Sequence, residues 1–484
     1  MTEVAFRSAA ALAAAIHRRE IGSRELLEHY LARADRHNAA LNAIIVTDLE
    51  RARRRANEAD AALARGEKWG PLHGLPMTIK ESFDVVGMPT TWGLPELKEN
   101  LPAANALAVD RLLGAGAVIF GKTNVPVMLA DSQSYNPVYG TTNNPWNRSL
   151  TPGGSSGGAA AALAAGLTAL EIGSDIGGSI RNPAHYCGVY GHKPSYGIAP
   201  PRGQALPGNV AASDISVIGP LARSAADLAL ELDVIAGPDP IDAAGWQLAL
   251  ASPRGNKLPD YRAAIMLDDP NCEVDREVQT ILQNLADFLA REGVRVSDRA
   301  RPDIDLAHFH AVYIQLLRAG TSRRLNQQEF EQQTETARRL DQADQSYFAR
   351  TLRANTLAHR DWLAGNEERH RLRLKWAEFF REYDLLLCPV TAGAAYPHDH
   401  AGERWERTIL VNGKRVPVTD DLFWAGLSGL VYLPTTVAPV GATSKGLPVG
   451  VQIIGPQYGD RSCIAFAGLL EEAFRGFVAP PGFG

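Results

Sequence analysis

Gly153-Gly-Ser-Ser-Gly-Gly158, followed by Gly173-Ser-Asp-Ile-Gly-Gly-Ser-Ile-Arg181, is the stretch on which the fold of this chain depends. Glycine loses more conformational entropy on folding than other residues, so glycine-rich runs need a structural or chemical reason. A Gly-Gly-Ser turn can aim successive backbone N–H groups at a developing oxyanion, and each such donor contributes about 3 kcal/mol in the transition state. Tight turns or a phosphate-binding nest are the alternatives. The residues favour a serine nucleophile, but they do not choose among Ser155, Ser156 and Ser179.

Two motif matches in this region are misleading. Gly153-Gly-Ser-Ser-Gly157 fits the nucleophile elbow G-x-S-x-G, which requires a strand immediately before the turn. The preceding residues 148–152 are a poor buried strand. Gly116-Ala-Val-Ile-Phe-Gly-Lys-Thr123 fits the phosphate loop, which requires an open turn. Its middle residues are strong strand formers, so the pattern predicts a core strand that ends in a glycine turn.

A serine nucleophile requires a base, and the sequence offers three candidates. His185 and His192 lie near the glycine-rich block, and both could equally be structural. Lys80 has strand-like flanks in Gly74-Leu-Pro-Met-Thr-Ile-Lys-Glu-Ser-Phe-Asp-Val85, which favours an inward-pointing side chain. A lysine acts as a base only when neutral, and burial or nearby positive charge lowers its pKa. No S-x-x-K occurs, which excludes the β-lactamase form of serine–lysine chemistry.

The glycine-rich runs and the segment around Lys80 resemble those of the amidase signature family. The resemblance is densest from Leu72 to about Gly237, and it includes Gly191-His-Lys-Pro194. It returns in Tyr383-Asp-Leu-Leu-Leu-Cys-Pro389 and Gly446-Leu-Pro-Val-Gly-Val-Gln-Ile-Ile-Gly455. The resemblance implies an α/β fold with a mixed central sheet between helices. It implies one amidase domain over 1–484, with a signature core at about 72–240 and a helical insertion or lid at about 305–382.

The resemblance also implies a Ser–cis-Ser–Lys triad. Ser179 is the nucleophile in that reading, Ser155 is the bridging serine after a cis peptide bond, and Lys80 is the base. Backbone N–H groups that would hold the oxyanion are those of Ile176, Gly177, Gly178 and Ser179. Supporting residues are Ser156, Asp175 and Arg181, and substrate contacts are Leu129 and Ser155. No metal and no organic cofactor are implied.

The activity implied is hydrolysis of a linear carboxylic amide to an acid and an amine or ammonia, through an acyl-Ser179 intermediate. Esters, anilides and carbamates are further substrates under this reading, and Trp92, Phe423 and Trp424 are expected in the pocket. The alternative is the glutamine-hydrolysing subunit of a tRNA-dependent amidotransferase. The helical region 305–382 and Trp424-Ala-Gly-Leu-Ser428 favour a stand-alone amidase. An inactive binding protein is a second rival, which the intact serines and lysine disfavour.

Composition and charge exclude several other classes of protein. The 484 residues carry a net charge of −5, which argues against a general nucleic-acid binder. The four cysteines are scattered without a C-x-x-C pair, which argues against zinc or redox chemistry. His398-Asp-His400 is expected to be a loop.

We expect a cytoplasmic protein without a signal peptide or membrane span, since the apolar stretch Ala159–Leu170 is too short to cross a bilayer. A small-molecule amide is the expected partner, and a homodimer is left open.

The pattern of apolar residues predicts the order of elements. Helices are expected within residues 8–66, one of them capped by Ser23, and an Ala-rich helix is expected over Gly158–Leu170. A strand, a helix and a second strand are expected over residues 261–296, which is typical of an α/β layer. Residues 305–382 are expected to be helical, and strands are expected at 384–388, 434–440 and 449–455.

Overall fold

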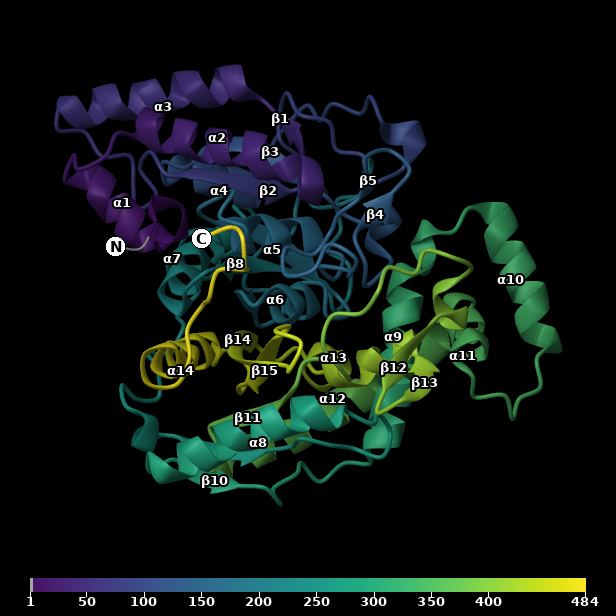
Figure 1. Cartoon of the computed structure of the whole chain (residues 1–484). Helices are drawn as coiled ribbons and strands as arrows, with labels where there is room; N and C mark the ends of the chain where they lie inside the picture. Colours follow the sequence, from purple (N-terminus) through teal and green to yellow (C-terminus); the bar gives the residue numbers. More distant parts are fainter. Residues whose placement is uncertain (1–2) are drawn as a thin grey trace.

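The computed structural model describes residues 3–484, and its centre is one mixed β-sheet (Figure 1). Within these residues the sheet has eleven strands in the order β1-β3-β2-β6-β8-β7-β14-β15-β11-β9-β10. The strands are β1 (Ile44–Thr47), β2 (Pro76–Lys80), β3 (Val118–Thr123), β6 (Glu171–Asp175), β7 (Tyr190–Lys193), β8 (Val217–Ala222), β9 (Arg262–Ile265), β10 (Arg295–Ser297), β11 (Leu385–Pro389), β14 (Thr435–Ala442) and β15 (Pro448–Ile454). Two small hairpins lie outside it, β4 (Tyr135–Asn136) with β5 (Gly140–Thr141), and β12 (Thr408–Val411) with β13 (Lys414–Pro417).

Helices cover both faces of the sheet. They are α1 (Ala9–His17), α2 (Ser23–Leu41), α3 (Leu49–Ala64), α4 (Leu107–Gly114), α5 (Gly157–Ala164), α6 (Arg181–Cys187), α7 (Ala225–Ile235), α8 (Arg276–Arg291), α9 (Leu306–Thr321), α10 (Gln327–Arg339), α11 (Tyr347–Asn355), α12 (His359–Glu382), α13 (Leu422–Gly429) and α14 (Asp460–Ala473). This arrangement of a mixed sheet between helices confirms the fold class predicted from the sequence.

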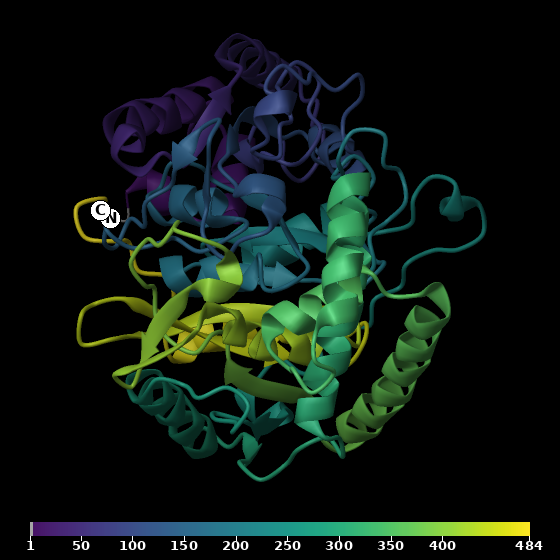
Figure 2. The same cartoon turned by 90° about the vertical axis from the view of Figure 1, so that its right-hand side faces the viewer.

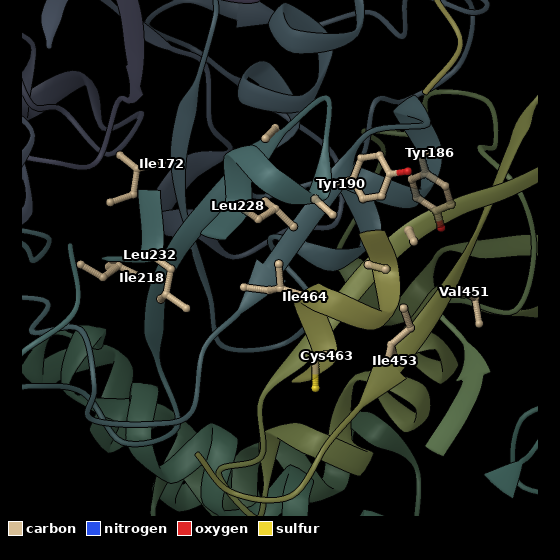
Figure 3. Packing of buried hydrophobic residues seen from close by; sticks show 14 of the residues in the cluster. Ile172, Tyr186, Tyr190, Ile218, Leu228, Leu232, Val451, Ile453, Cys463 and Ile464 are labelled. Atoms are coloured by element: carbon tan, nitrogen blue, oxygen red, sulfur yellow. The ribbon is translucent and has the colours of Figure 1, made fainter. Parts of the chain in front are cut away.

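Neighbouring residues of β8 face opposite layers. Leu221 belongs to the apolar cluster that α5 and α6 cover, whereas Ile218 and Ala222 belong to the larger core. Side chains alternate between the two faces of a strand, so a strand buried on both sides is apolar at nearly every position. Figure 3 shows the second layer, in which Leu228 and Leu232 of α7 lie near Ile464 of α14 and Ile218 of the sheet. Both faces of the central strands are therefore buried.

Parallel pairs with helical crossovers lie toward the two ends of the sheet, whereas the neighbouring strands from β6 through β8, β7, β14 and β15 to β11 are antiparallel. Strand β2 is parallel to β3 and to β6, and helix α4 lies between β2 and β3 in the chain. Strands β9 and β10 are also parallel, with α8 between them. Parallel neighbours need such a crossover, and their carboxyl ends meet at one edge of the sheet. This edge carries the end of β2 and the end of β6.

Most of the predicted elements are present, and two differ in their bounds. The strand–helix–strand unit over 261–296, the helical region 305–382 and the late strands are confirmed. Ser23 is not the N-cap but the first residue of α2, and its hydroxyl donates to the Gly74 carbonyl. The Ala-rich helix begins at Gly157 and ends at Ala164, because Gly166 adopts a left-handed φ of 66° that ends the helix.

The helical segment from α9 to α12 lies against one side of the sheet, and Figure 2 shows it in green, facing the viewer. Helix α9 packs against α11, α12 and α13. Helix α10 stands away from the sheet in Figure 1, and it has no buried residue. Within residues 3–484, no helix is both long and apolar enough to cross a lipid bilayer.

Gly219 in β8 is a position where the fold tolerates only glycine. A Cβ atom there would lie 2.3 Å from the His192 carbonyl oxygen and 2.6 Å from Pro194 Cδ. We expect Gly219→Ala to lower the free energy of unfolding by about 2 kcal/mol, because backbone atoms must shift to admit the methyl group. Denaturant titration measures this change. Gly114→Ala is the control, since nothing lies within 4 Å of its Cβ position. An unchanged Gly219→Ala midpoint would contradict the close packing of β7 and β8.

Candidate active site

The candidate site is built at the carboxyl ends of β2 and β6. Lys80 is the last residue of β2, and Ser174 is the residue before the last of β6. The two strands are parallel neighbours, with Ile79 opposite Ile172. The side chains of Lys80 and Ser174 therefore lie at the same edge of the sheet. Ser155 and Ser156 directly precede α5, and Ser179 lies in the turn between β6 and α6. The peptide bond between Gly154 and Ser155 is cis.

Lys80 contacts three serine side chains. Its Nζ lies 2.6 Å from Ser155 Oγ, 2.9 Å from Ser156 Oγ and 3.0 Å from Ser174 Oγ. The lysine is fully buried, and within residues 3–484 no carboxylate oxygen lies within the 4.0 Å of an ion pair. A neutral amine can donate to two of these oxygens and accept from the third, so the surroundings suit an uncharged lysine.

The electrostatics of the site favour that neutral form. Burial lowers the pKa of Lys80 from 10.5 to about 7, since an ammonium ion is costly away from water. The negative charges of Asp175 and Glu171 oppose this shift, and the positive charge of Arg324 adds to it. Glu171 is buried as well, and burial raises its pKa to about 8. Near neutral pH a large fraction of Lys80 is therefore able to accept a proton.

Asp175 and Arg181 form a buried ion pair under the Ser179 turn. Asp175 Oδ1 lies 2.9 Å from Arg181 Nη2, and the opposite oxygen accepts from Arg181 Nε at 3.0 Å. Arg181 also donates to Ser428 Oγ and to Gln452 Oε1. Burial alone would raise the pKa of Asp175, but the Arg181 guanidinium and its hydrogen bonds hold that pKa well below its usual range. The pair joins the turn to α13 and β15.

The same carboxylate organises the backbone of the turn. Asp175 accepts hydrogen bonds from the N–H groups of Gly178, at 2.9 Å, and Ile180, at 3.0 Å. Gly178 differs here from the expectation for an oxyanion donor, because its N–H is already bound. Within the described residues, the N–H groups of Ile176, Gly177 and Ser179 have no hydrogen-bond acceptor. Three of the four predicted donors are thus free to bind an oxyanion.

A cavity of about 780 Å³ opens in front of these groups. Its lining includes Ser155, Ser174 and Ser179, together with the apolar residues Trp92, Leu129 and Ile176. The expected pocket residues Phe423 and Trp424 do not line it: Phe423 is 2% exposed and Trp424 is fully buried, since both side chains pack into the core. The structure therefore brings together the predicted Lys80, Ser155, Ser156, Ser179 and Leu129. No hydrogen bond joins the Oγ atoms of Ser155 and Ser179.

Several residues of the site were missed by sequence reasoning. Ser174 contacts Lys80, and Gln204 donates to Ser174 Oγ at 3.2 Å. Arg324 lines the cavity from a helix that lies far along the chain. Ser174 lies next to Asp175 in the glycine-rich stretch, and this position could have indicated that it belongs to the site. No local signal marked Gln204 or Arg324, because only the tertiary fold brings their loops to the cavity.

The other candidate groups have structural partners. Lys122, in the phosphate-loop match, lies in β3 and donates to the Pro89 carbonyl and to Thr90 Oγ1. His192 contacts Asp460, and His185 accepts from the Gly450 N–H. The ring of His400 stacks on Tyr135, and among residues 3–484 no group of three or more His, Cys, Asp or Glu side chains could hold a metal ion.

The chain matches known amidases over nearly its whole length. The family described as Amidase matches residues 25–464. The chain is 34% identical to an indoleacetamide hydrolase of Bradyrhizobium diazoefficiens, over 96% of this chain and 86% of that protein. It is 32% identical to an acylamidase of Rhodococcus erythropolis, over 92% and 91% of the two chains. It is also 32% identical to one of the subunits of the glutamyl-tRNA(Gln) amidotransferase of an Anaeromyxobacter species, over 97% and 96%.

A solved structure gives the same result for the fold. The structure of 6-aminohexanoate cyclic dimer hydrolase complexed with substrate aligns with a TM-score of 0.80 and 27% identity, over 99% of this chain and 100% of that chain. The chain belongs to the amidase signature family, and it is a hydrolase that acts on amide C–N bonds.

Proposed function

We propose that Ser179 is the nucleophile, Ser155 the proton-bridging serine and Lys80 the base of this amidase. The observation that carries the proposal is the 2.6 Å contact between Lys80 Nζ and Ser155 Oγ at a fully buried lysine. Burial lowers the pKa of Lys80 to about 7, which leaves the amine free to accept a proton. Ser179 lines the same cavity as Ser155, and it lies near the end of the turn that Asp175 holds.

The reaction begins with a proton relay. Neutral Lys80 takes the Ser155 proton as Ser155 takes the proton of Ser179, and Ser179 Oγ attacks the amide carbonyl carbon. The relay requires Ser179 Oγ to come within hydrogen-bond distance of Ser155 Oγ when the substrate binds, a tightening that is common in catalytic sites. The electron pair of the carbonyl bond moves onto oxygen and gives a tetrahedral oxyanion.

The oxyanion is held by the backbone N–H groups of Ile176, Gly177 and Ser179. Each such donor contributes about 3 kcal/mol to transition-state stabilisation. Gly178 has a different role, because its N–H donates to Asp175 and fixes the turn. Arg181 neutralises Asp175 and ties it to Gln452, so the three free donors are held in place before the charge develops.

The C–N bond breaks as the relay returns its proton to the leaving nitrogen. The amine or ammonia departs, and an ester remains on Ser179. Water then attacks the ester carbonyl, the relay accepts the proton of that water, and the Ser179–carbonyl bond breaks to release the acid. Ser179 recovers its proton in the last step. Linear carboxylic amides are the proposed substrates, with esters, anilides and carbamates open to the same route.

In this proposal residues 1–484 form one amidase domain, with a signature core at about 72–240. The sheet supports this, because the one sheet takes in strands from β1 near the start of the chain to β15 near its end. The helical insertion at about 305–382 supplies Arg318 and Arg324 to the walls near Ser179, as a lid would. The four cysteines are free and buried, which fits a reducing cytoplasm.

Ser179→Ala tests the nucleophile. We expect kcat for an amide substrate to fall by about three orders of magnitude or more, with an unchanged thermal midpoint, because the hydroxyl is removed and the fold is kept. A fluorophosphonate probe should label the wild-type protein at the peptide that contains Ser179. The matched control is Ser149→Ala, an exposed serine outside the cavity. Covalent labelling that persists in Ser179→Ala would contradict the assignment.

The pH dependence tests Lys80. Because the base must be neutral, we expect kcat/KM to fall about tenfold per pH unit below a pKa of about 7 and to level off above it. A pH–rate profile from pH 5 to 9 measures this. Lys80→Met should be inactive at every pH. A wild-type rate that stays constant between pH 5 and pH 8 would exclude a neutral lysine as the base.

Asp175→Asn tests the brace under the turn. The change leaves the buried Arg181 without a counter-charge, so we expect a loss of about 3 kcal/mol or more in unfolding free energy. The kcat should also fall, since the N–H donors lose their support. Arg202→Gln is the control, because it breaks an exposed ion pair with Asp239 and should cost about 1 kcal/mol at most. Equal stability of the two variants would contradict this role.

A further inference from the structure

Three arginines surround a small inner cavity beside Ser179. Arg318 lies in the last turn of α9, Arg324 in the short helix η6 (Ser322–Arg324), and Arg404 in η7 (Arg404–Glu406). This cavity, called the inner cavity below, has a volume of about 30 Å³, and Ile176, Gly177 and Ser179 also line it. Leu129, Ile176, Ser179 and Arg324 line the large cavity as well, so the two spaces meet at the nucleophile.

These guanidinium groups have few partners. Arg324 donates to the Met128 carbonyl at 2.7 Å, and Arg318 donates to the hydroxyl of Tyr347. The Nε atoms of Arg318 and Arg404 are buried without a hydrogen-bond partner. Within residues 3–484, no carboxylate oxygen lies within 4.0 Å of any of the three side chains. The cluster therefore holds positive charge that nothing in the described chain neutralises directly.

The charges also act on one another. Burial lowers the pKa of Arg318 to about 9, and the nearby charges of Arg404 and Arg324 add to this shift. Burial likewise lowers the pKa of Arg324 to about 10. Like charges that share a desolvated space are costly unless an anion is bound between them. At neutral pH Arg318 and Arg324 therefore remain protonated, and the cluster favours an anionic ligand.

Two acidic groups face the cluster, and both have other partners. Asp131 lines the inner cavity, but it pairs with Arg407 at 2.6 Å and accepts from the Tyr135 hydroxyl. Asp421 feels the charge of Arg404, but its oxygens accept from the Ala392 N–H and the Tyr186 hydroxyl. Neither carboxylate satisfies the unpartnered Nε atoms.

We propose that the acyl part of the substrate carries a carboxylate, which Arg318, Arg324 and Arg404 bind. The proposal rests on Ser179 as the nucleophile. Arginine presents a planar fork that matches a carboxylate, and such charge-assisted hydrogen bonds are among the strongest in proteins. The inner cavity is compact enough for one carboxylate group. The substrate class is then the monoamides of short dicarboxylic acids.

The arrangement of the two cavities assigns the carboxylate to the acyl side. After the C–N bond breaks, the acyl group stays on Ser179 while the amine must leave. The large cavity provides the space through which the amine departs. A group held by three arginines in the inner cavity stays with the acyl-enzyme until hydrolysis. The leaving group therefore faces the large cavity, whose wider walls admit ammonia or a larger amine.

The first experiment compares substrates of matched shape. Malonamate, succinamate and glutaramate are compared with neutral amides, and 4-methylpentanamide is the uncharged isostere of succinamate. Ammonia release gives kcat/KM for each. We expect the best of the anionic amides to exceed its isostere by about tenfold to hundredfold, since a neutral acyl group leaves the arginines without partners.

The second experiment removes the charges one at a time. Arg318→Gln and Arg404→Gln should each lower kcat/KM for the preferred anionic amide by about tenfold or more, while the neutral isostere changes less than threefold. Arg338→Gln is the control, because that arginine is 74% exposed on α10. In Ser179→Ala, the anionic amide should raise the thermal midpoint more than its isostere does. This binding readout does not depend on turnover.

The outcomes separate this inference from the proposed function. Equal kcat/KM for anionic and neutral amides would overturn the inference and leave the amidase assignment intact. The inference also fails if no anionic amide is hydrolysed while a fluorophosphonate still labels Ser179. It fails too if inorganic phosphate speeds the hydrolysis of neutral amides, because the cluster would then bind a free anion. Absence of both hydrolysis and labelling would count against the proposed function itself.

Discussion

The burial of one lysine at the end of a central strand is the constraint on which this site depends. Lys80 is surrounded by serine oxygens, with no carboxylate within ion-pair distance among the described residues. The side chain is fully buried, so an ammonium group there would lose its hydration, and this lowers the pKa of Lys80 toward neutrality. A neighbouring carboxylate would reverse this effect. The apolar layers on both faces of the sheet therefore contribute to chemistry as well as to stability, since they keep the lysine dry.

The buried ion pair of Asp175 and Arg181 fixes the conformation of the turn that carries Ser179. The turn that carries Ser179 must hold several N–H groups pointing to one place, and backbone in a loop is usually mobile. Asp175 fixes the turn by accepting from Gly178 and Ile180, and Arg181 fixes Asp175 in turn. Arg181 also reaches Gln452 of β15, so the turn is attached to the last part of the sheet. The geometry of the proposed oxyanion site is thus set by the whole fold.

The relatives of this chain share a common core and carry different names. An indoleacetamide hydrolase, an acylamidase and one chain of a tRNA-dependent amidotransferase match at 32–34% identity. A shared core with different substrates is expected when chemistry lies on strand ends and selection lies in loops and insertions. Here the helical segment from α9 to α12 brings Arg318 and Arg324 beside Ser179, the proposed nucleophile, and a later loop brings Arg404. In our proposal, the charge of these three arginines selects an anionic acyl group over a neutral one.

The sequence by itself determined the core of this protein. The strand patterns predicted an α/β fold with a helical region at 305–382, and the family resemblance implied the mixed sheet and pointed to Ser179, Ser155 and Lys80. These features are local, because a strand or a turn motif is encoded by neighbouring residues. Tertiary structure decided what depends on distant residues: the contact of Ser174 with Lys80, the bound state of the Gly178 N–H, the burial of Phe423 and Trp424 in the core, and the arginines that meet beside Ser179. Those positions follow from how segments far apart in the chain pack together, and no local pattern records that packing.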